Sequence, residues 1–99
     1  GAAASTGVGE EVTRIAGTAR VVASMRAGLS PQAACEEAVK HIAQLRGDAI
    51  KGLQVGFLAL GQDGRIGAYA LLPGFTYAVT RHSGASEVLP SASLFSQAP

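Results

Sequence analysis

Residues 53–60 and 65–72 are predicted strands that are apolar on both faces. Successive side chains of a strand point to opposite faces, so a sheet with one face in water alternates apolar and polar residues. Here Val55 and Phe57 point one way, and the equally apolar Leu58 points the other. A sheet built from these strands therefore needs an apolar cover on each of its faces.

Two amphipathic helices are predicted ahead of the strands, and they can supply one of these covers. Apolar residues recur at three- and four-residue steps over residues 9–27, and again over residues 31–46 after the Ser30-Pro31 start signal. Gly28 ends the first helix, and the short link predicts an antiparallel neighbouring pair. Nothing else in the chain is large enough for the second face, so we expect it to pack on a sheet or subunit outside these 99 residues.

Turn signals predict that the strands form a three-stranded antiparallel meander, which makes the fold class α+β. Asp63-Gly64 is a hairpin signal between the first two strands. Pro73-Gly74 is a second turn, and it precedes a third strand over residues 75–81.

Two further features are local. Gly56 and Gly67, inside the strands, indicate bulges or close approach of another element. Residues 84–99 are rich in Ser, Ala and Pro and are predicted to form an irregular tail of the single domain.

Composition gives no reason to expect nucleic acid or a membrane as partner. The net charge is +1 and only 5% of residues are aromatic. No apolar run approaches the roughly 20 residues that a membrane helix needs, and the first residues do not form a signal peptide. The lone Cys35 excludes a disulfide within the chain and is predicted to be a buried, inert thiol.

The stretch Ser5-Thr6-Gly7-Val8-Gly9-Glu10-Glu11 is the strongest candidate for chemistry. It places a hydroxyl and free backbone N–H groups directly before the first predicted helix, where the helix dipole favours negative charge. Such a corner can bind an anion or a developing oxyanion. The alternative is that Ser5 or Thr6 caps the helix while the glycines shape the turn.

The other ionisable residues are predicted to have structural roles. His41 and His82 are expected to be solvated, Asp63 belongs to a turn, and Glu10 and Glu11 suit the first turn of a helix. No cluster has metal-ligand spacing, so we predict no metal and no cofactor.

Several motifs resemble glycosylasparaginases when taken in order. Residues 2–11 resemble the Ala-rich Thr-Gly-x-Gly-[Asp/Glu] segment of that family. The further matches are Met25-Arg26-Ala27-Gly28, Ser30-Pro31-Gln32-Ala33-Ala34-Cys35, Gln54-Val55-Gly56-Phe57, Gly67-Ala68-Tyr69 and Phe75-x-x-Ala78-Val79. The resemblance implies an N-terminal-nucleophile hydrolase with an αββα sandwich, which fits strands that are apolar on both faces.

The resemblance also implies a reaction. Glycosylasparaginase precursors cut themselves ahead of a threonine, giving α and β chains, and this threonine attacks the side-chain amide of N4-(β-N-acetylglucosaminyl)-L-asparagine. Thr6 matches the threonine whose hydroxyl helps to form the oxyanion hole. Gly7 matches a glycine that supplies a backbone N–H there and touches the α-amino end of the substrate.

The chain departs from the family pattern because the nucleophilic threonine, and the arginine and aspartate that hold the substrate, are absent from it. It resembles the C-terminal part of a β chain, which we expect to be inactive alone. The implied partners are the α chain and the rest of the β chain, in an (αβ)2 dimer. The implied compartment is the periplasm for a bacterial protein and the lysosome for a eukaryotic one.

Two rival interpretations stay open at this point. A plant-type asparaginase or isoaspartyl peptidase shares the Thr-Gly-x-Gly start, although the Gly-Ala-Tyr and Phe-x-x-Ala-Val pairings favour glycosylasparaginase. A non-catalytic α+β interaction module, whose exposed sheet face docks a partner, would be preferred if the native chain begins at Gly1 and folds as a stable monomer.

Overall fold

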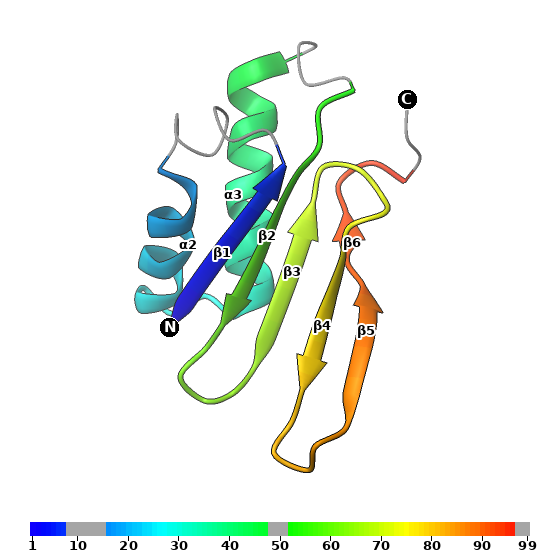
Figure 1. The fold of residues 1–99 in the computed structure, drawn as a ribbon. Helices are drawn as coiled ribbons and strands as arrows, with labels where there is room; N and C mark the ends of the chain where they lie inside the picture. Colours follow the sequence, from blue (N-terminus) through cyan, green and yellow to red (C-terminus); the bar gives the residue numbers. More distant parts are fainter. Residues whose placement is uncertain (8–15, 48–51, 97–99) are drawn as a thin grey trace.

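The computed structural model describes residues 1–7, 16–47 and 52–96, which form two helices and six strands (Figure 1). In chain order the elements are β1 (Ala2–Gly7), α2 (Gly17–Arg26), α3 (Pro31–Arg46), β2 (Val55–Leu60), β3 (Ile66–Ala70), β4 (Thr76–Thr80), β5 (Ser86–Pro90) and β6 (Ala92–Ser93). The predicted α+β class is confirmed. None of the described helices is long and apolar enough to cross a membrane.

The strands form two sheets, so the predicted three-stranded meander is wrong. One sheet has the order β1-β2-β3-β6, with β1, β2 and β3 antiparallel and β6 parallel to β3. The other is a hairpin of β4 and β5. Gly74, at φ +106°, turns the chain out of the first sheet. The free edge of β3 is instead bonded by the returning chain, where the Leu94 N–H donates to the Ala70 carbonyl at 2.8 Å.

The irregular tail predicted over residues 84–99 is also wrong, because β5 and β6 both lie in it. A tight turn at Gly84, with φ +87°, lets β5 pair back along β4. The Thr80 and Ser86 hydroxyls join the two strands at 2.8 Å. Polar side chains can occupy these strands because the faces of the hairpin are largely exposed to water.

Both predicted helices are present, but the first differs from its prediction. Ala16 has φ 51°, in the left-handed region, so one unbroken helix over residues 9–27 is wrong and α2 begins at Gly17. Residues 8–15 lie outside the described part of the chain. The start of α3 is confirmed, because the Ser30 hydroxyl accepts a hydrogen bond from the Ala33 N–H at 3.1 Å and Pro31 takes the first position.

The core lies between the helices and one face of the first sheet. Fully buried side chains from both layers of this contact include Val21, Val39, Ile42, Phe57 and Leu71. The predicted close approach at Gly67 is confirmed, since a Cβ there would lie 2.3 Å from the backbone carbon of Pro31. The helices thus cover one face of the sheet, as the sequence predicts.

Cys35 is buried in this core, and the predicted buried thiol is confirmed. Burial, and secondarily the charge of Glu36, raise the pKa of the thiol from 9.0 to about 12. Burying the neutral thiol therefore stabilises the fold fully below pH 9.0, and this contribution is lost as the pH rises towards about 12. At pH 8 we expect a thiol reagent to label Cys35 in the urea-unfolded chain but not in the folded one, and equal labelling would contradict the buried position.

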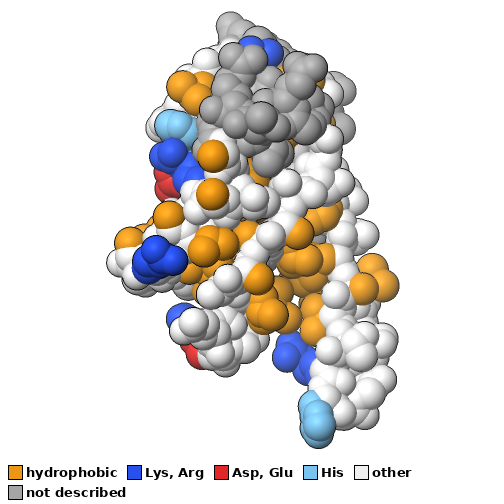
Figure 2. All heavy atoms as spheres, turned by 60° about the vertical axis from the view of Figure 1, so that its left-hand side comes forward, with side chains coloured by type: hydrophobic (Ala, Val, Ile, Leu, Met, Phe, Trp, Pro, Cys, Tyr) orange, Lys and Arg blue, Asp and Glu red, His pale blue; other side chains and the backbone are white. Residues whose placement is uncertain are grey.

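The other face of the sheet is only partly covered, by β4. A Cβ on Gly56 would lie 2.9 Å from Cδ2 of Phe75, which confirms the predicted close approach at this glycine. Further along, Leu60 is 50% exposed. A groove of about 380 Å³ runs between this face and β4, and Figure 2 shows apolar side chains gathered at the middle of the molecular surface. The second apolar face predicted from the sequence is therefore present, and β4 covers only part of it.

Candidate functional site

Thr6 and Gly7 lie at the end of strand β1, where they pair with Gly56 and Val55 of β2. Thr6 caps neither of the two described helices. The residue that caps α2 is Ala16, which makes no side-chain hydrogen bond to the helix. The prediction that a helix starts at residue 9 lies outside the described residues.

Thr6 belongs to the face of the sheet that points away from the helices. In the antiparallel register Thr6 lies across from Gly56, whereas its neighbour Ser5 lies across from Phe57, which is buried in the core. The Thr6 side chain is exposed and lines a cavity of about 250 Å³, together with Phe75 and residues of β4. Within the described chain its hydroxyl makes no side-chain hydrogen bond. It is therefore available to donate to a ligand in this cavity.

The Phe75 ring lines the same cavity as Thr6. It rests on Gly56, the residue that pairs with Thr6, and any side chain at position 56 would displace it. The sequence marks Gly56 as a point of close approach but gives no sign of which residue approaches. Phe75 reaches Gly56 because the chain turns at Gly74 and brings β4 over the sheet.

Gly7 takes a conformation that only glycine adopts easily. Its φ is +106°, and a Cβ there would lie 2.1 Å from the carbonyl oxygen of Gln54. The backbone of β1 thus ends in direct contact with the residue that precedes β2. Sequence reasoning singled out Gly7. It placed Gln54 within a predicted strand and in the Gln54-Val55-Gly56-Phe57 match, but it assigned no role to the Gln54 side chain.

The other ionisable residues considered from the sequence are not gathered near Thr6. His82 is exposed in the turn between β4 and β5, and His41 is half-buried on α3. Asp63 receives hydrogen bonds from the Arg65 N–H at 3.1 Å and its guanidinium at 2.6 Å, and these lower the pKa of the carboxyl. Glu10 and Glu11 lie outside the described residues. Among described residues no three His, Cys, Asp or Glu side chains could hold a metal.

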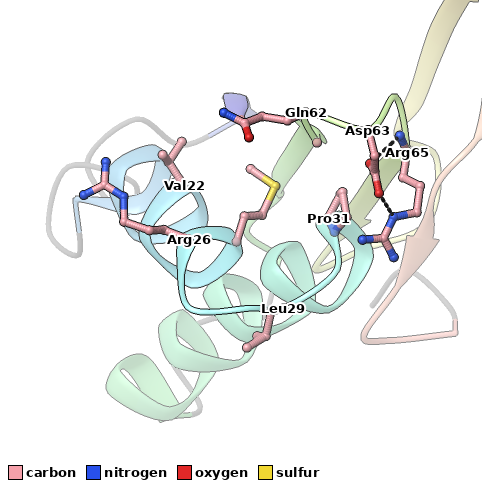
Figure 3. Close-up of a pocket in the computed structure, with 10 residues that line it drawn as sticks. Val22, Arg26, Leu29, Pro31, Gln62, Asp63 and Arg65 are labelled. Atoms are coloured by element: carbon pink, nitrogen blue, oxygen red, sulfur yellow. Dashed lines mark hydrogen bonds and ion pairs between the residues drawn. The ribbon is translucent and has the colours of Figure 1, made fainter.

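A larger pocket, of about 550 Å³, lies at the opposite end of the first sheet (Figure 3). It is lined by residues of α2 and of the turn between β2 and β3. Asp63 and Arg65 pair with each other at 2.6 Å on one side of it, and Arg26 extends away from them on the other. Among the described residues that line it, the charged side chains are Arg26, Asp63 and Arg65, and the last two neutralise each other.

Comparison with known proteins places the chain in a family. Residues 1–89 match the family described as Asparaginase. The chain is 48% identical over 87 residues to the N(4)-(beta-N-acetylglucosaminyl)-L-asparaginase of Elizabethkingia miricola, an alignment that covers 85% of this chain and 26% of that protein. The chain thus spans about a quarter of the length of this relative. It belongs to the asparaginase family of N-terminal-nucleophile hydrolases.

Proposed function

We propose that this chain supplies the oxyanion-binding side of the active site of an amidohydrolase that cleaves N4-(β-N-acetylglucosaminyl)-L-asparagine. The observation that carries the proposal is the position of Thr6, whose side chain lines a cavity and whose hydroxyl makes no side-chain hydrogen bond within the described chain. Gly7 follows at the strand end, where the chain leaves the sheet. A hydroxyl and a glycine backbone can both approach a substrate oxygen closely.

The half-covered face supports an assembly with further segments. The helices and the first sheet account for two layers, and the β4–β5 hairpin begins a third over the outer face. In the proposed enzyme, the α chain and the rest of the β chain complete the second sheet and its helical cover, giving an αββα sandwich. Burying the apolar face under these segments stabilises the assembly by about 25 cal/mol per Å² of apolar surface. The proposed assembly is an (αβ)2 dimer.

The reaction then proceeds by covalent catalysis. The hydroxyl of an N-terminal threonine outside this chain attacks the amide carbon, and its α-amine accepts the proton. The carbonyl oxygen becomes an oxyanion, which the Thr6 hydroxyl and the Gly7 N–H stabilise, each such donor contributing about 3–4 kcal/mol in known cases. The C–N bond breaks and the amino sugar leaves with the proton. Water then hydrolyses the acyl-enzyme to aspartate, and Gly7 also contacts the α-amino end of the substrate.

The substrate assay tests this function. The complete enzyme that contains this chain should hydrolyse glycosylated asparagine faster than β-aspartyl dipeptides, when the two are compared by kcat/KM. The reverse preference would assign it to the plant-type asparaginases or isoaspartyl peptidases, with the same roles for Thr6 and Gly7. Hydrolysis of neither substrate would favour a non-catalytic α+β interaction module.

The 99 residues alone should show no turnover and should self-associate. The nucleophile is supplied from outside, and the apolar groove between the sheet and β4 is open to water. Light scattering after gel filtration measures the association, and Leu60→Lys should reduce it because this half-exposed side chain lines the groove. A monomeric chain at micromolar concentration would contradict the expectation of a missing layer.

A further inference from the structure

A side-chain amide extends the pairing of β2 with β3 beyond the last residues of the two strands. The Gln54 Oε1 accepts hydrogen bonds from the N–H groups of Leu72 at 2.9 Å and Val55 at 3.1 Å. The Gln54 Nε2 donates to the Leu72 carbonyl at 2.8 Å. The neighbouring backbone bond joins the Leu71 N–H to the Val55 carbonyl at 2.9 Å. The Gln54 side chain therefore takes the place of a peptide group in the next rung of the ladder.

The backbone of Gln54 also supports Gly7. There is no room for a side chain between them, since a Cβ on Gly7 would lie 2.1 Å from the Gln54 carbonyl oxygen and 2.9 Å from the Val55 Cα. A shift of Gln54 would consequently shift the end of β1, and with it the residue pair proposed to bind the oxyanion.

The bonds to Leu72 hold the segment that leads to Phe75, a second wall of the same cavity. Leu72 is followed by the turn at Pro73 and Gly74, and this turn carries the Phe75 ring onto Gly56. If the bonds to Leu72 were lost, no other side-chain hydrogen bond within the described chain would join this part of the turn to the start of β2. One residue thus links both walls of the Thr6 cavity while lining neither.

We propose that Gln54 is a positioning residue for the reaction, which holds Thr6 and Gly7 at a fixed distance from Phe75. This inference rests on the proposed function, because it names the residue that sets the geometry of the same site. Gln54 acts through its neighbours and does not touch the substrate. A displacement of about 1 Å at a reacting centre can lower a rate by on the order of 10²-fold, so the effect on turnover is measurable even when the fold survives.

The chain contains a matched control for this residue. Gln32, on α3, makes the same pair of bonds to Ala68: its Nε2 donates to the carbonyl at 2.7 Å, and its Oε1 accepts from the N–H at 2.9 Å. Both glutamines are half-buried. Gln32 approaches the sheet from the helical side, whereas the cavity opens on the other face, so its loss should alter stability without altering the site.

The test compares Gln54→Met with Gln32→Met in the complete enzyme, using glycosylated asparagine. We expect similar losses of thermal stability, a fall in kcat on the order of tenfold for Gln54→Met, and a change of less than about twofold for Gln32→Met. Gln54→Glu keeps the acceptor for the two N–H groups but places a carboxylate oxygen against the Leu72 carbonyl, so it should also lower kcat. Gln32→Glu makes the same change against the Ala68 carbonyl and should not lower kcat. The two glutamate variants also keep the test valid if a methionine variant does not fold.

A double-mutant cycle with Thr6→Ala separates positioning from general destabilisation. If Gln54 acts through Thr6, removing the hydroxyl first should leave the second substitution with a much smaller effect on kcat. Equal losses of kcat in the Gln54 and Gln32 variants, or independent effects of Gln54→Met and Thr6→Ala, would overturn the positioning role while the proposed function stands. A wild-type enzyme inactive on every amide substrate would overturn both, and is recognised before any variant is compared.

Discussion

Replacing Thr6 by alanine in the complete enzyme should lower kcat by roughly 10²–10³-fold. The Thr6 side chain lines a cavity from an exposed strand position, and within the described chain its hydroxyl makes no side-chain hydrogen bond. Its removal should therefore change the stability of the fold little. Steady-state kinetics on glycosylated asparagine measure the effect, and a thermal melt shows whether the variant folds. KM should change less than kcat, because an oxyanion forms only in the transition state.

Two substitutions control for this prediction. Thr6→Ser keeps the hydroxyl and should retain most of the activity. Thr80→Ala removes a hydroxyl that is bonded to Ser86 at the far end of the hairpin, and it should leave kcat unchanged. Unaltered turnover in a folded Thr6→Ala enzyme would refute the oxyanion role and leave Thr6 as an ordinary surface residue of a strand.

Local signals in the sequence were sufficient for one layer of the fold. The start of α3 follows from Ser30 and Pro31, whose capping chemistry acts within one turn and needs no tertiary context. The period of two in β2 also groups Val55 with Phe57 on one face, and Phe57 is fully buried there, although both faces are apolar and the pattern does not say which one the helices cover. Gly67 and Gly56 mark the places where α3 and Phe75 come close, because a missing side chain is visible in the sequence itself.

Pairings between distant segments could not be predicted in this way. Half of strand β1 is alanine, which has low β propensity, and it is a strand because it pairs along β2, about fifty residues later in the chain. The Pro73-Gly74 turn signal is correct, yet it cannot say whether the next strand stays in the same sheet. That depends on the later turn at Gly84 and on β6 occupying the edge of β3.

In the candidate site, too, local sequence signals were informative and contacts between distant segments could not be predicted. Thr6 and Gly7 were identified from motif resemblance, but their placement at a helix start was an inference from local pattern, and in the described chain they end a strand. Phe75 and Gln54 complete the site through contacts that cross the sheet. A single sequence cannot reveal such contacts, because each residue is unremarkable among its own neighbours.

Replacing Gly7 by alanine should destabilise the complete enzyme by about 2–5 kcal/mol, combining backbone strain at a positive φ with a steric clash. A Cβ would lie 2.1 Å from the Gln54 carbonyl oxygen, so β1 or the start of β2 must move. Gly74→Ala is the matched control, since Gly74 has the same φ of +106° but open space around its Cβ position. It should cost only the strain, about 1–2 kcal/mol. Urea unfolding of both variants measures the difference, which isolates the clash. Equal losses of unfolding free energy in the two variants would mean that Gln54 can move away from Gly7 at no cost. The close contact between Gly7 and Gln54 would then have no role in holding the site.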